Sequence, residues 1–400
     1  MKKYFYFLAL SANLLWLSSC DTEKNIAPRF DKTFIKLYGG DYKNQAVDLI
    51  ALDDGGFAIL GSIISTSINQ EQDILFLVTD SVGNVKIRKQ IGDPTIGEQP
   101  VKMVHDTDGY VICGNLLNQP VDRVFIYRIS NSADSVEYKT YNNFIFNDMT
   151  ETSDNTKLVF TGVYQDTVMA ELTIARSDLT DTSFVSNWWI SYGVKVDKNH
   201  TTEFPDTYKI LGSINGDIVI KLWDLDKKDS YISVRDTANE NSIPVDFLRG
   251  NYNGDNYIIV GYNNDPSDPL ADGPFVSEIK VENQVGKVIA NHFITSPTAD
   301  YSNVIPSSLF KYESSNYLLL GTEKGPDISG KIRLLKLDQN FNVLADKSFG
   351  TGAGDQGVIM NILPDYSVIF LATVNYVPDK PGTYSKIALF KLTPDLSLDY

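Results

Sequence analysis

The sequence predicts an all-β fold in which a four-stranded antiparallel unit repeats along the chain. A turn followed by a short apolar strand recurs about every fifty residues, and no helical pattern separates the copies. The chain also begins with an unpaired fourth strand and finishes on an unpaired third strand. Repeats of this length made only of strands are typical of β-propellers. We therefore expect residues 33–400 to form a seven-bladed β-propeller, with six or eight blades as alternatives.

The anchor of each repeat is the turn and the second strand of the unit, and it usually ends in glycine. The clearest copies are DDGGFAILG, DTDGYVICG and NGDNYIIVG. The seven anchors are placed at Gly61, Gly114, Gly162, Lys221, Gly261, Gly321 and Ala372, with successive gaps of 53, 48, 59, 40, 60 and 51 residues. The short gap of 40 residues predicts that the fourth unit lacks an outer strand near Ala238 to Ile243.

A third and a fourth strand follow each anchor. Third strands such as DILFLVTD, RVFIYRIS and SYISVRD are apolar on both sides in several copies, which suits a sheet covered on both faces. Fourth strands end at an aromatic residue followed by glycine, as in WWISYG at Gly193 and ADKSFG at Gly350. Each unit therefore supplies four antiparallel strands before the next one begins.

The ends of the chain predict how the ring closes. FIKLYG, residues 34–39, has the form of a fourth strand with no unit before it, while the chain finishes on KIALFKL, a third strand with no fourth after it. We expect Phe34 to Tyr38 to pair with Ile387 to Leu392, so that the last blade is built from both ends and no sheet edge is left open there.

The whole pattern resembles the bacterial β-propeller repeats with a Y-G-G…D-G-G…G…K-x-D-x-x-G signature. The resemblance covers nearly all of the chain after residue 32. It implies a fold, and it carries no catalytic residue with it.

The first nineteen residues have the composition of an export signal peptide, with two lysines before a short apolar run. The run ends in Leu17-Ser18-Ser19-Cys20, which resembles the lipobox of bacterial lipoproteins. The resemblance implies that Cys20 carries lipid such as palmitate and becomes the mature N-terminus. Residues 20–32 then form the lipidated cysteine and a polar tether. We expect attachment to a membrane through this lipid alone, in the bacterial cell envelope and at the outer membrane, with the periplasmic and surface sides both open.

Charge and cysteine content narrow the class of protein further. The formal net charge is −16, and loss of the signal peptide with Lys2 and Lys3 makes it −18. Phosphate backbones would repel such a surface, so nucleic acid is excluded as a partner. With Cys20 lipidated, Cys113 is the one remaining thiol, and stability must come from core burial and not from a disulfide.

Several motifs lose their functional interpretation in context. FGTGAGDQGVIMNIL contains G-x-G-x-x-G, but a strand and not a helix is predicted after it, so the helix N-terminus that a pyrophosphate needs is missing. GPDISGKI has Ile332 where a P-loop needs Ser or Thr, and we interpret it as a turn. His105, His200 and His292 lack metal-ligand spacing. We predict no metal, no cofactor and no catalytic residue.

Long connections point to one face of the ring as the functional surface. The loops between second and third strands and the crossovers between units include most of the long connections, and loops on rigid scaffolds commonly carry binding residues. The candidate ligand-binding residues on this face are Tyr42, Tyr262, Asp265, Asp268, Asp272, Glu323, Tyr376 and Asp379. We expect an envelope binding or assembly module that engages a protein or a glycan there; the alternative is a glycan hydrolase or lyase that uses paired carboxylates.

Overall fold

The computed structural model describes residues 33–398 apart from short internal segments. The segments outside the description are 41, 65–71, 94, 106, 122, 135, 153–155, 165–167, 188–191, 199–206, 215–216, 225–229, 234–241, 250–255, 264–272, 283–284, 296–299, 314, 326–327 and 376–383. Cys20, with the expected signal peptide and tether, lies outside the described residues. Within the described residues, no helix is long and apolar enough to cross a membrane.

The strands of the described residues form seven four-stranded antiparallel sheets. Sheet 1 contains β2 (Lys43–Ala51), β3 (Phe57–Ile64), β4 (Gln72–Thr79) and β5 (Val85–Ile91). Sheet 2 contains β6 (Gly97–His105), β7 (Gly109–Leu117), β8 (Arg123–Ser130) and β9 (Val136–Asn142). Sheet 3 contains β10 (Phe144–Glu151), β11 (Lys157–Tyr164), β12 (Val168–Ala175) and β13 (Asp181–Asn187). Sheets 4 and 5 are β14 (Tyr192–Lys198), β15 (Thr207–Ile214), β16 (Asp217–Asp224) and β17 (Ser230–Ser233); and β18 (Ser242–Arg249), β19 (Asn256–Asn263), β20 (Gly273–Glu282) and β21 (Val285–Phe293). Sheets 6 and 7 are β22 (Val304–Tyr312), β23 (Asn316–Gly325), β24 (Ile328–Leu337) and β25 (Val343–Phe349); and β26 (Gln356–Ile362), β27 (Val368–Val374), β28 (Lys386–Leu392) and β1 (Phe34–Tyr38).

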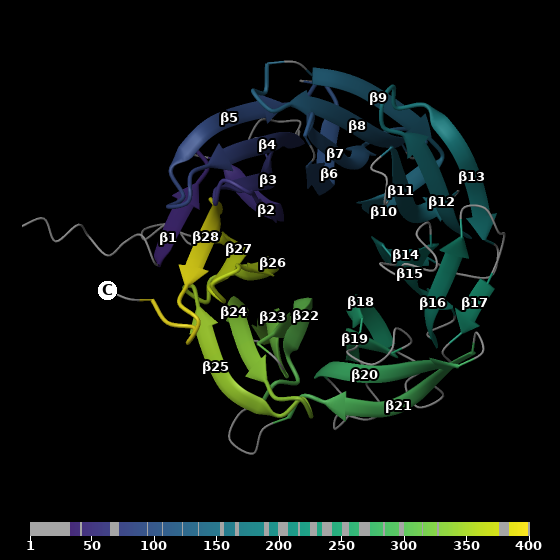
Figure 1. The fold of residues 1–400 in the computed structure, drawn as a ribbon. Helices are drawn as coiled ribbons and strands as arrows, with labels where there is room; N and C mark the ends of the chain where they lie inside the picture. Colours follow the sequence, from purple (N-terminus) through teal and green to yellow (C-terminus); the bar gives the residue numbers. More distant parts are fainter. Residues whose placement is uncertain are drawn as a thin grey trace, which may run out of the picture.

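The sheets stand side by side around a ring, with the first strand of each nearest the centre and the fourth strand at the rim (Figure 1). This arrangement confirms the predicted all-β propeller architecture. Because successive strands are antiparallel, the first-to-second and third-to-fourth turns share one face, which we call the short-turn face. The second-to-third loops and the crossovers between sheets share the other, which we call the long-loop face.

The chain's two ends close the ring as the sequence predicts. β1 pairs with β28 in antiparallel register, from Phe34 opposite Lys391 to Tyr38 opposite Ile387. Phe34 and Tyr38 are buried between sheets 7 and 1, and the Tyr38 hydroxyl donates to the carbonyl oxygen of Gly83 over 2.8 Å. The outermost strand of sheet 7 therefore fastens the start of the chain both to its end and to sheet 1.

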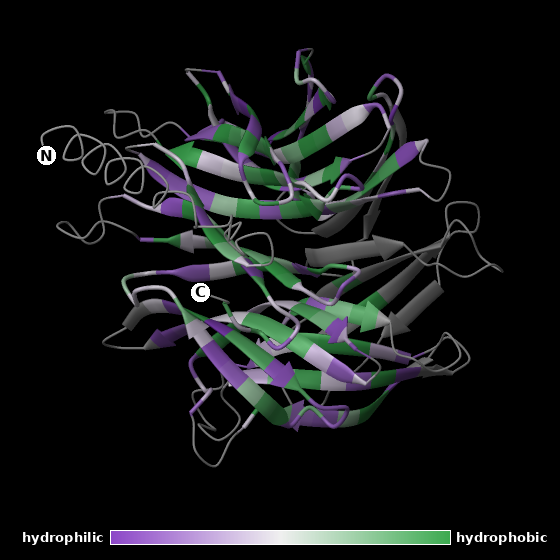
Figure 2. Ribbon diagram, turned by 60° about the vertical axis from the view of Figure 1, so that its left-hand side comes forward, coloured by the Kyte–Doolittle hydropathy of each residue, from purple (hydrophilic) through white to green (hydrophobic). Residues whose placement is uncertain are grey.

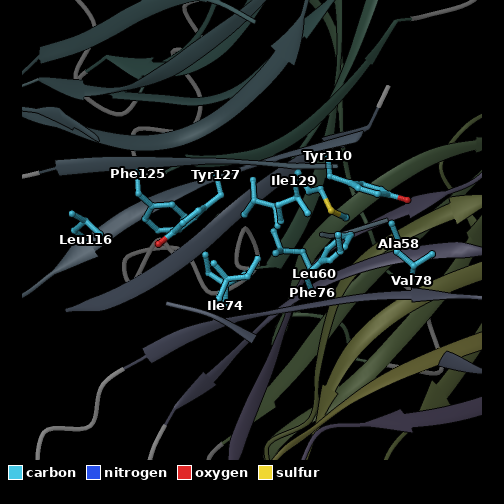
Figure 3. Close-up of a cluster of buried hydrophobic side chains, with 14 residues drawn as sticks. Ala58, Leu60, Ile74, Phe76, Val78, Tyr110, Leu116, Phe125, Tyr127 and Ile129 are labelled. Carbon is cyan, nitrogen blue, oxygen red and sulfur yellow. The ribbon is translucent and has the colours of Figure 1, made fainter. Parts of the chain in front are cut away.

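The core lies between neighbouring sheets. Middle strands are buried almost throughout, as in β3 and β27, whereas the rim strand β5 alternates between exposed and partly buried residues. Figure 3 shows the cluster between sheets 1 and 2, where Phe76 of β4 and Tyr110 of β7 approach in an edge-to-face contact with ring centroids 4.8 Å apart. Figure 2 colours the residues by hydropathy and shows hydrophobic segments along the strands. Two covered faces explain the nearly continuous apolar runs.

A β-bulge at the same place in every sheet explains the anchor glycine. Each first strand carries one extra residue, and the partner opposite the residue before the bulge is Gly61, Gly114, Gly162, Gly212, Gly261, Gly321 or Ala372. A β carbon at Gly114 would come within 2.1 Å of the Gln99 carbonyl oxygen, and one at Gly162 within 2.0 Å of that of Ile145. The first-strand carbonyl thus approaches too closely for most side chains.

Sheet 4 corrects part of the predicted repeat. Its second strand is β15, with Gly212 opposite the bulge, so Lys221 lies on the third strand β16 and is not an anchor. Gly212 follows Gly162 by 50 residues and precedes Gly261 by 49 residues, which removes the irregular gaps. Residues 230–233 of SYISVRD form the fourth strand β17, so the expected absence of an outer strand is wrong. Gly193 lies on the first strand β14 and does not end a fourth strand.

The turns that follow the third strands of sheets 2, 3, 6 and 7 place an apolar residue in the left-handed backbone conformation. Ala133, Leu179, Phe341 and Leu396 have φ between 55° and 62°, and Gly83 occupies the matching position in sheet 1. Their side chains are buried, and the Phe341 ring lies 5.0 Å from that of Tyr317 and 5.1 Å from that of His292. Burial of these side chains offsets a backbone conformation that L-residues normally avoid.

Candidate ligand-binding site

A cavity lined mainly by polar side chains opens on the short-turn face. It has a volume of about 770 Å³. Its walls come from sheets 1, 2 and 3 and are made of Ile50, Ala51, Asp53, His105, Thr107, Asp108, Arg128, Thr156, Arg176 and Ser177. Every one of these residues lies at the short-turn end of a strand or in a turn. The cavity is therefore a product of three sheets meeting, and no single repeat contains it.

Arg128 projects from the third strand of sheet 2 and is the more accessible of the two cavity arginines, with a side chain 28% exposed. Its Nη1 donates to the carbonyl oxygen of Ser177, 2.9 Å away in sheet 3. Its ion pairs with Asp108 and Glu137 are long, at 4.0 and 3.7 Å, and these two carboxylates are 72% and 63% exposed. Exposed pairs of this length contribute little to stability, so the guanidinium is held mainly by Ser177.

Arg176 follows the third strand of sheet 3 and is almost fully buried, with a side chain 7% exposed. Its Nη1 donates to the Glu151 carboxylate, and its backbone N–H donates to the carbonyl oxygen of Thr156 over 2.9 Å. This arginine is a fixed part of the cavity wall. Its charge is matched by Glu151, which lies at the end of β10 in the same sheet.

His105 ends the first strand of sheet 2. Its ring stacks in a tilted arrangement on Tyr110 with centroids 4.5 Å apart, and its Nε2 lies 3.3 Å from the side-chain oxygen of Asn131. Asn131 in turn donates to the carbonyl oxygen of Thr107 over 2.7 Å. His105 thus packs beside the turn that follows β6, and these contacts hold its ring in the cavity wall.

A separate charged group lies on the innermost strands. Burial by itself would lower the pKa of Lys102, but the carboxylates of Asp48, Asp148 and Asp246 raise it above the usual lysine value. The Lys102 ammonium lies 3.5 Å from Asp48. It is not among the residues that line the cavity, and its role is to neutralise the aspartates of the inner strands.

A carboxyl group with a raised pKa also lies outside the cavity. The pKa of Glu98 is raised because its side chain is buried; it accepts hydrogen bonds from the Tyr127 hydroxyl at 2.7 Å and the Asp93 N–H at 3.1 Å. Glu98 lies at the long-loop end of β6, outside the cavity. Among the described residues, no group of three or more metal-ligating side chains could hold a metal ion. The side chains that line the cavity can form hydrogen bonds and ion pairs.

The predicted site residues fall into two groups. Asp265, Asp268, Asp272, Tyr376 and Asp379 lie outside the described residues. Tyr42 is exposed at the start of sheet 1, while the Tyr262 hydroxyl donates to the Ser302 carbonyl oxygen over 3.1 Å. Glu323 accepts from Arg333 over 2.8 Å. Tyr262 therefore ties sheet 5 to the crossover that leads into sheet 6, whereas the Glu323 contact lies within sheet 6. The binding role of the long-loop face remains a prediction.

The glycine-rich stretch is a structural loop, as the sequence indicates. The strand β26 follows it, and the buried Asp355 carboxylate accepts N–H donors from Thr351, Gly352 and Asn375, the last two at 3.1 and 2.8 Å. An internal carboxylate thus accepts the N–H groups of this loop. GPDISGKI likewise belongs to the β23–β24 hairpin, with Gly325 opposite Ile328.

Arg128 and Arg176 are not among the site residues predicted from the sequence. The available signal was a charged residue within or just after a third strand that is otherwise apolar, in RVFIYRIS and AELTIARS. Strand periodicity could not show that the two arginines line one cavity, because they belong to neighbouring sheets. Only the ring arrangement brings their strand ends together.

Comparisons with known proteins show distant likenesses to solved structures and no family match. No protein-family model matches the sequence, and no curated protein matches it. The β-propeller domain of the trilobed protease from Pyrococcus furiosus is 11% identical with a TM-score of 0.47, and the match covers 83% of this chain and 92% of that chain. The periplasmic gluconolactonase of Pseudomonas aeruginosa is 10% identical with a TM-score of 0.49, over 86% and 93%. A functionally unknown protein from Desulfotomaculum acetoxidans is 9% identical with a TM-score of 0.45, over 75% and 88%. Likenesses this distant carry no argument about function.

Proposed function

We propose that this chain is a lipid-anchored binding module of the bacterial cell envelope. Its seven sheets act as the blades of a rigid scaffold, and a glycan binds in the cavity on the short-turn face. The observation that carries the proposal is the cavity of about 770 Å³ in which charged and hydroxyl side chains from three sheets converge. Ligand sites of this size are concave and largely pre-formed in other proteins.

The lining chemistry favours a sugar over an apolar ligand. Eight of the ten lining residues carry polar side chains, and only Ile50 and Ala51 are apolar. Threonine and serine hydroxyls, arginine donors and aspartate acceptors together match a ligand with many hydroxyl groups. Rigid strand ends hold these groups, so little ordering entropy opposes binding.

The proposed anchor would place the cavity on the side of the molecule from which the tether leaves. β1 begins at the short-turn face, because Phe34 pairs with Lys391 beside the turn that follows β28. A tether over residues 21–32 would span at most about 40 Å when fully extended. The glycan would then be bound close to the membrane to which the protein is attached.

A glycan screen tests the binding role. The full chain, purified in detergent, is applied to an array of neutral and acidic bacterial glycans, and hits are measured again by calorimetry. We expect binding that Thr107→Ala and Ser177→Ala weaken without lowering the unfolding midpoint. Absence of binding to every glycan class would remove this function.

A labelling experiment tests the anchor. Cells that express the protein are grown with radioactive palmitate, and the membrane and soluble fractions are compared. We expect label in the intact chain and none in Cys20→Ser, which should also leave the membrane fraction. Label that persists in Cys20→Ser would contradict lipidation at this residue.

Two cavity carboxylates keep the alternative of a glycan hydrolase or lyase open to test. Asp53 and Asp108 both line the cavity, and glycosidases use a pair of carboxyl groups. If the alternative holds, a bound glycan is cleaved by the native chain and left intact by Asp53→Asn and Asp108→Asn. Binding without cleavage supports the binding module.

A protein partner for the long-loop face belongs to the same proposal and is tested by crosslinking from Tyr42.

A further inference from the structure

Three arginines of the described chain differ in how closely their guanidinium groups approach carboxylates. Arg333 binds Glu323 and Asp346 at 2.8 and 3.1 Å and is 17% exposed. Arg176 is 7% exposed and donates to Glu151. Arg128 meets its carboxylates only at 3.7 and 4.0 Å, beyond hydrogen-bond distance. Arg128 therefore differs from the other two in having no close carboxylate among the described residues.

The position of Arg128 makes this difference meaningful. Its Nη1 is fixed by the Ser177 carbonyl at 2.9 Å, so the guanidinium is oriented before any ligand arrives. A guanidinium carries five N–H donors arranged as a planar fork that matches a carboxylate. An oriented fork in a cavity wall binds a carboxylate with two parallel hydrogen bonds and little loss of side-chain freedom.

We propose, building on the proposed function, that the ligand of this cavity is a glycan with a hexuronic acid unit whose carboxylate binds Arg128. The ring of that unit then lies among the hydroxyl side chains of Thr107, Thr156 and Ser177, which also line the cavity. Arg176 and Glu151 keep the wall in shape, and Arg128 determines the preference for an acidic sugar.

Charge at the mouth of the cavity is compatible with this preference. Asp108 is 72% exposed and 4.0 Å from Arg128, so a ligand carboxylate can replace it as the partner of the guanidinium while Asp108 turns to water. Solvent screens an exposed carboxylate strongly, so its repulsion of the ligand is weak. The close partner of Arg128 would then be the ligand.

The test compares acidic and neutral sugars of equal size. Calorimetry on the full chain in detergent uses di- and trigalacturonate, the matching galactose oligomers, and galactose 6-phosphate. We expect galacturonate to bind at least tenfold more tightly than its neutral counterpart. Arg128→Gln should abolish this preference by weakening galacturonate binding much more than binding of the neutral sugar. Arg128→Lys should restore only part of the preference because the fork is lost.

Controls separate this proposal from the general function. Lys86→Gln removes an exposed cation of the short-turn face that pairs with Asp54 outside the cavity, and it should change neither affinity. Unfolding midpoints of all variants show whether the fold is kept. Equal binding of acidic and neutral sugars, or a preference that survives Arg128→Gln, overturns the carboxylate proposal and leaves glycan binding standing. Tighter binding of the phosphate overturns it as well. No binding of any sugar defeats both proposals.

Discussion

The carboxylate of Asp246 accepts the backbone N–H of Leu309 over 2.9 Å and so joins the innermost strands of sheets 5 and 6. Its other oxygen accepts the N–H of Phe247, the next residue of its own strand, over 2.8 Å. Asp48 makes the same two contacts, with Met103 of sheet 2 at 2.9 Å and Leu49 at 3.0 Å. Both aspartates follow the bulge directly. The bulge thus aims a buried carboxylate at the neighbouring sheet.

Replacing Asp246 should therefore loosen the ring. In Asp246→Ala the N–H groups of Phe247 and Leu309 lose a charged acceptor in a buried place, and we expect about 2–4 kcal/mol of lost stability. Urea unfolding followed by fluorescence measures it. Glu313→Gln is the control, because its pair with Lys336 is exposed and contributes only tenths of a kcal/mol. Equal effects of the two variants would contradict the inter-sheet role.

Glu98 should make stability depend on pH in a defined direction. Its pKa in the folded chain is raised above the ordinary value of 4.5 by burial. The folded state therefore holds this proton more tightly than the unfolded state. The stabilisation that the protonated Glu98 provides is complete below the ordinary pKa and is lost as pH rises through the raised pKa of the folded chain. Glu98→Gln removes this loss. Between about pH 4 and about pH 8, the unfolding midpoint of the variant should rise relative to that of the native chain. A constant difference would show that Glu98 does not titrate differently on folding.

Phe341 and Tyr366 share a backbone conformation and should respond in opposite ways to substitution. Their φ values are 62° and 63°, but Phe341 is buried between aromatic rings and Tyr366 is 52% exposed. Phe341→Gly should cost about 3 kcal/mol or more, because the lost packing exceeds the relief of strain. Tyr366→Gly should leave stability unchanged or raise it by up to about 1 kcal/mol. Thermal unfolding of both variants decides, and a large loss in Tyr366→Gly would contradict the strain argument.

Closure of the ring depends on a short strand from the start of the chain. Deleting residues 33–39 removes the pairing of β1 with β28 and the burial of Phe34 and Tyr38, so we expect at least about 3 kcal/mol of lost stability. The unfolding midpoint measures it. A control deletion of residues 22–31 shortens the expected tether and should leave the midpoint where it was. Equal midpoints for the two deletions would show that β1 does not fasten the ring.

Much of the fold could be predicted because local sequence patterns specify its strands and turns. The anchor strands and the apolar third strands recur at a near-constant period, and the closing pair follows from strand types at the two ends. The error in sheet 4 has a local cause: TYKILGSI and DIVIKLWD are both short apolar strands next to a turn. Only the bulge opposite Gly212 shows which of them is the second strand.

By itself, then, the sequence determined the repeating four-stranded unit, the covered middle strands and the meeting of the two ends, because burial on both faces and turn chemistry act over a few residues. The tertiary structure decided which charged and polar side chains line one cavity. Arg128 and Ser177 are 49 residues apart and belong to different sheets, and they meet only because the ring sets neighbouring third strands side by side. A contact made between two repeats leaves no periodic trace within either one.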